Sequence, residues 1–141
     1  MELASDSVFD PTRGVRVKLT PEERVRQAVV YYLTTELGYP LDLIANEATI
    51  TVGKVSRRCD TVVFSPGERK PLMVLEYKAP SVPLSPKVLA QALEYNSVLS
   101  ARVVVVTNGR EMCVYLPDGK DKQPMLLSDL PRFEALIKED Q

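Results

Sequence analysis

The sequence contains no histidine and no tryptophan, and it has only two cysteines among its 141 residues. Without histidine, the chain cannot build a Ser-His-Asp triad, a Cys-His pair or a histidine-ligated zinc site on its own. A general base must therefore be Asp, Glu, Lys, Tyr or water. A bound metal must be held by oxygen atoms or by two widely spaced thiols.

The scarcity of cysteine and of long apolar runs bears on the compartment. Cys59 and Cys113 do not form a CxxC pair, and two cysteines are too few for a disulfide framework, so we expect two buried, reduced thiols. No apolar run approaches the roughly 18 to 20 residues that span a bilayer. The N-terminus lacks a basic stretch followed by an apolar one, so no signal peptide is expected. These absences favour a cytoplasmic protein with no membrane partner.

An excess of charge of either sign is also lacking. The chain has 18 Lys and Arg against 19 Asp and Glu, a formal net charge of -1. This balance argues against a surface that is basic all round and leaves room only for a local basic patch. Hydrophobic residues make up 45% of the chain, which indicates a folded domain rather than a disordered segment. We expect a loose arm over residues 1–19, a core domain over 20–116 and an extension over 117–141.

The first strong local signal is a helix start. Thr20 is a good N-cap, Pro21 suits the first helical position, and Glu23 completes a capping box. Gly38 then ends the helix. Apolar side chains recur between these points at helical spacing, at Val25, Ala28, Val29, Tyr32 and Leu33.

Further along the chain, alternating and β-branched runs predict strands. Ser85 and Pro86 repeat the N-cap and N1 pattern and open a second helix that runs to about Leu99. The run from Val103 to Val106 is typical of a central strand buried on both faces. The remaining expected elements are strands over 48–52, 57–64, 72–78 and 112–116, a short strand over 15–19, and a helix over 131–138. The core order α, β, β, β, α, β, β predicts an α/β fold with a mixed central sheet flanked by helices.

A pair of carboxylates falls on the hairpin formed by the second and third core strands. If its loop is symmetric, it centres on Glu68, and Asp60 faces Glu76. In this register the paired residues are Phe64 with Leu72, Val62 with Val74, and Asp60 with Glu76. Apolar side chains therefore lead along one face into two carboxylates, with Lys78 beside them.

Like charges on cross-strand neighbours repel, so something must offset the pair. A bound cation, the ammonium group of Lys78 or a raised carboxyl pKa would each do so. A divalent cation is the most natural occupant, and a site of carboxylate oxygens suits Mg²⁺ or Mn²⁺. The alternative is a salt-bridge cluster of Asp60, Glu76 and Lys78 at the strand ends, without a ligand.

The second helix carries a further polar pair. Gln91 and Tyr95 share one face with Val88, Ala92 and Leu99. Both polar side chains could hydrogen-bond at the carboxylate site or to a phosphate. Alternatively, the amide is solvated at the helix edge and the tyrosine only packs.

Asp60, a loop and then Glu76-Tyr77-Lys78 on the next strand resemble the PD-(D/E)XK nuclease superfamily. The segment from Gln91 to Tyr95 looks like the QxxxY motif of its exonuclease-like branch. More closely, the chain is similar to the N-terminal nuclease domain of type I restriction enzyme R subunits. The stretches that carry this likeness are residues 21–23 with 26–27, 58–64, 75–80, 91–96 and 107–109.

The resemblance implies a restriction-endonuclease-like αβββαβ core and metal-dependent DNA hydrolysis. Asp60, Glu76 and the main-chain carbonyl of Tyr77 would hold Mg²⁺ or Mn²⁺, with Glu23 as a further candidate ligand. Lys78 would orient the attacking water and stabilise developing charge, and Gln91 and Tyr95 would complete the catalytic set. The capping-box role is the alternative for Glu23.

Two departures from the family pattern limit what carries over. Cys59 stands where the motif expects proline, and no GxxxxGK[ST] loop of a translocase is present. The chain is thus either a free-standing relative or a fragment, with a translocase or specificity subunit as a potential partner in trans. DNA is the expected substrate.

Local phosphate contacts are expected from Lys54, Arg57 and Arg58, and from the basic residues of the N-terminal arm. Their alternative is ordinary solvated charge. A non-catalytic nucleic-acid-binding or assembly module competes with the nuclease hypothesis, and a small structural α/β domain remains if the hairpin register is wrong.

Overall fold

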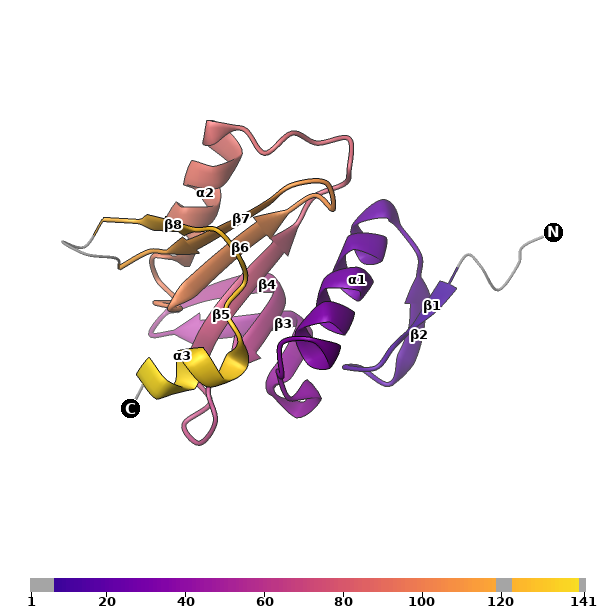
Figure 1. Ribbon diagram of the computed structural model, residues 1–141, viewed down its shortest axis with the longest axis horizontal. Helices are drawn as coiled ribbons and strands as arrows, with labels where there is room; N and C mark the ends of the chain where they lie inside the picture. The colour runs from indigo at the N-terminus through magenta and orange to yellow at the C-terminus, as the bar shows by residue number, and fades with distance from the viewer. Residues whose placement is uncertain (1–6, 119–122, 140–141) are drawn as a thin grey trace.

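The computed structural model describes residues 7–118 and 123–139 (Figure 1). Residues 1–6 of the expected arm, and residues 119–122 and 140–141 of the expected extension, lie outside this range. The helices are α1 (Pro21–Thr35), the 3-10 turn η2 (Leu41–Leu43), α2 (Pro86–Asn96) and α3 (Phe133–Glu139). The strands are β1 (Ser7–Asp10), β2 (Val15–Lys18), β3 (Ile44–Val52), β4 (Val55–Phe64), β5 (Pro71–Tyr77), β6 (Val103–Thr107), β7 (Met112–Leu116) and β8 (Met125–Leu127).

A mixed sheet with the strand order β3-β4-β5-β6-β7-β8 forms the centre of the molecule. Its one parallel pair is β5 with β6, which α2 connects, and its other pairs are antiparallel. Buried residues of α1 and α3 pack on one face, and α2 covers the other. The β6 side chains alternate between these two cores, as predicted for a strand buried on both faces. Within the described residues, no helix is long and apolar enough to cross a membrane.

Both main helices begin at the predicted caps. The Thr20 hydroxyl accepts the Glu23 N–H at 3.0 Å, and the Ser85 hydroxyl accepts the Val88 N–H at 3.3 Å. The reciprocal half of the expected capping box is wrong, because the Thr20 N–H donates to the carbonyl of Lys18 instead. The Glu23 carboxylate is therefore available for other partners.

The predicted register of the β4–β5 hairpin is confirmed over its central pairs. Thr61 lies opposite Leu75, Val62 opposite Val74, and Val63 opposite Met73. A bulge between Val63 and Phe64 then shifts the pairing, so Phe64 faces Pro71 rather than Leu72. The shift occurs at the loop end, because the Ser65 N–H closes the turn onto the Lys70 carbonyl at 2.8 Å.

The N-terminal segment is not the loose arm expected from its sequence. The strands β1 and β2 form an antiparallel hairpin, so the single expected strand has a partner. Its turn closes when the Gly14 N–H donates to the Asp10 carbonyl at 2.8 Å. The Asp10 side chain is fully buried, and Figure 1 shows the hairpin beside α1. The hairpin is thus anchored to the rest of the fold.

Two further strands differ from expectation. The strand β3 begins at Ile44 rather than at residue 48, and Glu47 within it has a positive φ of 55°. This left-handed residue interrupts the side-chain alternation, which explains why the first half of β3 does not read as a strand. Beyond Leu116, β8 adds a sixth strand to the sheet, and Leu136 of α3 is buried in the core.

Candidate functional site

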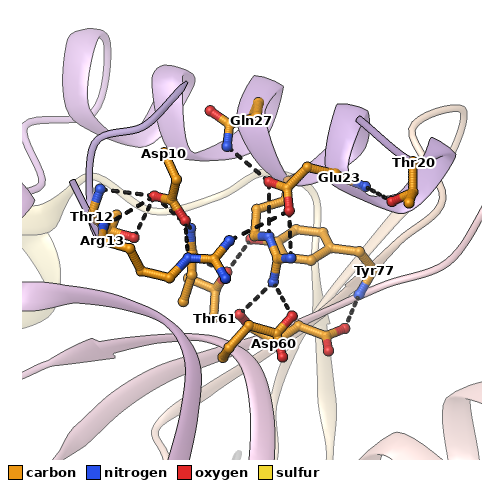
Figure 2. Close-up of polar contacts among 12 residues, drawn as sticks. Asp10, Thr12, Arg13, Thr20, Glu23, Gln27, Asp60, Thr61 and Tyr77 are labelled. Atoms are coloured by element: carbon orange, nitrogen blue, oxygen red, sulfur yellow. Dashed lines mark hydrogen bonds and ion pairs between the residues drawn. The ribbon is translucent and has the colours of Figure 1, made fainter. Parts of the chain in front are cut away.

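Asp60 lies in the middle of β4, just before the residues that pair with β5, and Glu76 lies near the end of β5. The observed pairs end at Thr61 with Leu75, and continuing this register by one residue places Asp60 opposite Glu76. The Tyr77 N–H donates to Asp60 Oδ2 at 2.9 Å, which fixes one carboxylate against the backbone of the neighbouring strand (Figure 2). Both carboxylates also line the same pocket of about 270 Å³. The structure therefore brings together the two acidic residues that the sequence singled out.

Lys78 follows directly after β5 and lies beside these carboxylates. Its Nζ is 3.7 Å from Glu76 Oε1, and its main-chain N–H donates to the Thr107 carbonyl at 2.9 Å. The next turn holds this region in place, because Asn108 Nδ2 donates to the Val82 carbonyl at 2.8 Å. The Asn108 side-chain oxygen accepts two main-chain N–H groups of the same turn. The Thr107-Asn108-Gly109 stretch thus anchors the segment that carries Lys78.

The electrostatics of the pocket favour a cation. Four carboxylates (Glu22, Glu47, Asp60 and Glu76) line it, against the two cationic groups of Arg26 and Lys78. Burial raises the pKa of Asp60, and the charge of Glu47 raises it further, although the Tyr77 N–H opposes the shift. Burial also raises the pKa of Glu76. The charge of Lys78 opposes this shift, and the charge of Asp60 adds to it. Ionising both carboxylates in this shared pocket is unfavourable, and a bound divalent cation would offset the repulsion between their charges.

Few side chains in the pocket could bind a metal ion. Among the residues that the structure describes, no three Asp, Glu or Cys side chains converge in a way that could hold a metal. An ion at this position would therefore be held by Asp60 and Glu76, with main-chain or water oxygens completing its coordination. Mg²⁺ fits such a site, because it usually retains several waters and binds through one or two carboxylates.

Glu47 is a pocket residue that sequence analysis missed. Its carboxylate accepts from Arg26 Nη1 at 2.9 Å and from Arg58 Nη2 at 2.7 Å. Burial alone would raise the pKa of Glu47, but these two guanidinium groups hold it below its usual value. No sequence signal marks this residue, because its position depends on a left-handed backbone at a non-glycine residue. Such strain in a strand is often found at functional sites.

Arg26 links α1 to the floor of the same pocket. Its guanidinium donates to Glu47 and, at 3.0 Å, to the main-chain carbonyl of Asp60. It also donates to both oxygens of Glu23, at 2.7 and 3.2 Å. These charged partners raise the pKa of Arg26 against the effect of its burial. The i, i+3 spacing of Glu23 and Arg26 is the signal that could have predicted this ion pair.

The placement of Glu23 corrects its expected role as a metal ligand. Its carboxylate is buried and occupied by Arg26 and by Gln27 Nε2, which donates at 2.8 Å. The side chain of Glu22, one residue earlier on α1, lines the pocket instead. Helical geometry explains the difference, because adjacent residues on a helix point about 100° apart.

The two polar residues of α2 separate. The Tyr95 hydroxyl accepts the Arg58 N–H and donates to the Arg58 carbonyl, both at 2.9 Å. Tyr95 lines a second pocket of about 210 Å³ together with Asp60 and Glu76. Gln91 is exposed, and within the described residues neither of the two carboxylate pockets is lined by it. Catalytic roles for Gln91 and Tyr95 stay predictions.

The predicted DNA contacts lie on and near the turn between β3 and β4. Lys54 is exposed in this turn, and Arg58 is largely exposed despite its ion pair with Glu47. The Arg57 guanidinium stacks over the Tyr95 ring at 5.0 Å. Cys59, which stands at the proline position of the motif, is a buried free thiol. Burial, together with the neighbouring carboxylates, raises the pKa of this thiol to about 11, so it is unreactive at neutral pH.

Comparisons with known proteins identify the family and the fold of this chain. The family model for the type I restriction enzyme R protein N terminus matches residues 21–131. A comparison with curated proteins gives no match. A fragment of a candidate HsdR subunit of a type I restriction enzyme from Vibrio vulnificus YJ016 superposes with a TM-score of 0.64 at 23% identity, over 85% of this chain and 25% of that one. This chain therefore spans a quarter of the Vibrio fragment.

A second solved structure shares the fold over most of both chains. It is a candidate nuclease of the DUF820 group from Anabaena variabilis ATCC 29413, with a TM-score of 0.55 at 16% identity. The superposition covers 94% of this chain and 84% of that one. The chain therefore belongs to the family of the type I restriction enzyme R protein N terminus, and its fold is that of a PD-(D/E)XK-like nuclease domain.

Proposed function

We propose that this chain is a metal-dependent nuclease domain that hydrolyses DNA phosphodiester bonds with Mg²⁺ or Mn²⁺. The observation that carries the proposal is the placement of Asp60 and Glu76 directly beyond the last pair of the β4–β5 ladder, in one pocket, with Lys78 beside them. Family membership supports the same reading.

Each residue of the site has a chemical task in this proposal. Asp60 and Glu76 supply the metal-binding oxygens, together with the main-chain carbonyl of Tyr77. When bound, the ion lowers the pKa of an attacking water and polarises the scissile phosphate. Lys78 orients the water and stabilises the negative charge that develops on the oxygens of the scissile phosphate. No histidine is required for any of these tasks.

The chain itself has few groups that would bind the phosphates of DNA. Its net charge is -1, so the basic groups near the β3–β4 turn must supply most local phosphate contacts. We therefore infer that a partner which binds DNA, such as a translocase or specificity subunit in trans, brings the domain to its substrate.

The decisive experiment compares the unaltered chain with Lys78→Ala on single- and double-stranded DNA, with Mg²⁺ or Mn²⁺ and with chelator. We expect metal-dependent cleavage that falls by about 100-fold or more in the variant, because charge stabilisation of this kind contributes several kcal/mol. Lys87→Ala, which removes an exposed lysine from α2, is the matched control and should cut normally. Equal cutting by Lys78→Ala and the unaltered chain would refute the mechanism.

Titration calorimetry with Mn²⁺ tests the metal site separately. We expect binding heat for the unaltered chain and none for Asp60→Ala. Identical heats for the two proteins would remove Asp60 from the site, whatever the cleavage assay shows.

A non-catalytic DNA-binding or assembly module is the second candidate. The observation that favours it is the partial compensation of the carboxylates by the chain itself, through Lys78 at Glu76 and the positive charge of Arg26 near Asp60. Under this candidate, the unaltered chain would bind DNA equally with metal and with chelator, and would not cut it.

A further inference from the structure

The N-terminal hairpin places one buried acid next to the machinery of the site. Asp10 ends β1 and is fully buried, although residues 7–18 precede the segment that matches the family model. Its carboxylate accepts from the Thr12 N–H at 2.8 Å and from the Thr12 hydroxyl at 2.6 Å, which closes the hairpin turn. These local bonds would suffice for a turn. Two further sets of contacts extend from Asp10 into the core.

The first route consists of alternating charges. The Arg13 guanidinium is ion-paired with Asp10, and its Nη2 lies 3.6 Å from Glu23 Oε1. Glu23 in turn binds Arg26 at 2.7 Å, and Arg26 donates to the main-chain carbonyl of Asp60 at 3.0 Å. Figure 2 shows this chain of contacts running beneath α1 from Asp10 to Asp60. The main chain of Asp60 is thereby tied to the hairpin.

The second route consists of hydrogen bonds that run through the uncharged side chains of Asn46, Thr61 and Tyr77. Asn46 Nδ2 donates to both oxygens of Asp10, at 3.3 and 3.2 Å. The Thr61 hydroxyl donates to Asn46 Oδ1 at 2.7 Å, and the Tyr77 hydroxyl donates to the Thr61 hydroxyl at 2.8 Å. The main-chain N–H of Tyr77 donates to Asp60 Oδ2. This route therefore reaches the carboxylate of Asp60.

We propose that Asp10 is a positioning residue for the metal-binding carboxylate of Asp60, and that the β1–β2 hairpin is part of the site's supporting structure. The inference rests on the proposed function. The two routes leave Asp10 separately and converge on Asp60, one at its main-chain carbonyl and one at its side chain. Partners that fix the orientation of metal ligands typically change metal affinity by about 10- to 100-fold when they are removed.

A purely structural role would make a different prediction. The participants Asp10, Thr61 and Tyr77 are buried, and a buried polar network is costly unless all of its members are paired. If the network only stabilised the fold, its loss would lower stability without changing the site. Metal affinity at matched stability therefore separates the two roles.

The chain offers a matched pair of hydroxyl deletions for this test. Tyr77→Phe breaks the second route, while Tyr39→Phe removes a hydrogen bond of 2.7 Å to the Pro131 carbonyl that belongs to neither route. Asp10→Asn keeps the size of the side chain but loses its charge toward Arg13. Mn²⁺ affinity by calorimetry, thermal unfolding and the hydrogen-exchange rate of the Tyr77 amide are measured for all of them.

We expect Asp10→Asn and Tyr77→Phe to bind Mn²⁺ about 10-fold more weakly. The Tyr77 amide, which donates to Asp60 Oδ2, should exchange faster in both variants than in the unaltered chain. Tyr39→Phe should lose stability but keep the Mn²⁺ affinity of the unaltered chain. Unchanged Mn²⁺ affinity in folded Asp10→Asn and Tyr77→Phe overturns the positioning role and leaves the proposed function intact. An unaltered chain that binds no Mn²⁺ and cuts no DNA overturns the proposed function itself, and the positioning role with it.

Discussion

The paired carboxylates Asp60 and Glu76 act against the stability of the folded chain. Burial raises the pKa of each, so their folded-state pKa values exceed the unfolded ones. A carboxyl group shifted in this direction destabilises the fold progressively as pH rises from its unfolded pKa through its folded pKa. Above the folded-state pKa values the full cost is present. A pair kept at such a cost is more consistent with ligand binding than with stability.

Neutralising one member of the pair should therefore not harm the metal-free fold. Asp60→Asn keeps an oxygen to accept the Tyr77 N–H, and we expect its melting temperature in chelator at pH 7.5 to equal or exceed that of the unaltered chain. Mn²⁺ should raise the melting temperature of the unaltered chain but not that of Asp60→Asn. Asp42→Asn, at an exposed acid on η2, serves as the control. A variant that is clearly less stable in chelator would contradict this account.

Asp10 should show the opposite pH dependence. Its burial would raise its pKa, but hydrogen bonds from Thr12, Arg13 and Asn46 outweigh it and lower the pKa to about 2. A lowered folded pKa stabilises the fold above the unfolded value, by about 2 kcal/mol for a shift of this size. The contribution is lost as pH falls from about 4 through about 2.

Urea unfolding tests this sign. At pH 7 we expect Asp10→Asn to have a free energy of unfolding about 2 kcal/mol below that of the unaltered chain, and at pH 3 about half of that difference. An equal difference at both pH values would show that the charge of Asp10 is not what stabilises the hairpin.

At the scale of elements, local signals and long strand pairs were predictable, and short non-local pairings were not. Thr20 and Ser85 mark helix starts because capping depends on residues within one turn. The β4–β5 register follows from a symmetric loop between two apolar runs. In contrast, β1 and β8 have four and three residues, too few for a periodic pattern. The buried contacts of Asp10 have no local signal either, because its partner Asn46 is 36 positions away.

The turn after β6 offers a test of how closely the elements pack. Gly109 has a φ of 87°, and a Cβ at this position would lie 3.1 Å from a γ-methyl of Val25 on α1. Gly53, with a φ of 62°, has open space around the same position. Both alanine variants should lose about 1 kcal/mol to backbone strain.

We expect Gly109→Ala to lose about 1 kcal/mol more than Gly53→Ala in urea unfolding, because of the contact with α1. Val25→Ala removes the γ-methyl groups that the new Cβ would contact. Its cost in free energy of unfolding should therefore be about 1 kcal/mol smaller in the Gly109→Ala background than in the unaltered chain. Equal destabilisation by the two glycine variants would mean that the turn is free to move away from α1.

At the scale of the whole molecule, the candidate site lies at one end of the sheet. It forms where β5 ends, while α3 and the β4–β5 loop border a different pocket, which Ile137 and Glu68 line. The sequence could predict the acidic pair of this site because both residues lie on one hairpin. It could not predict Glu47 or the route from Asp10, because these join strands that are separated by whole elements.

The location of the site at one end of the sheet, combined with a net charge of -1, predicts a small and localised electrostatic contribution to DNA binding. If Lys54, Arg57 and Arg58 supply the phosphate contacts, the logarithm of the association constant should fall with the logarithm of salt concentration with a slope of about 3. Lys54→Ala with Arg58→Ala should weaken binding and reduce the slope to about 1, since each phosphate contact contributes roughly one unit. The surface ion pair of Arg58 with Glu47 does not prevent this, because exposed pairs contribute little.

Lys138→Ala, on α3 beside the other end of the sheet, should leave both affinity and slope unchanged in a fluorescence anisotropy titration. An equal loss in that variant would mean that DNA contacts are spread over the surface and that the β3–β4 turn has no special role.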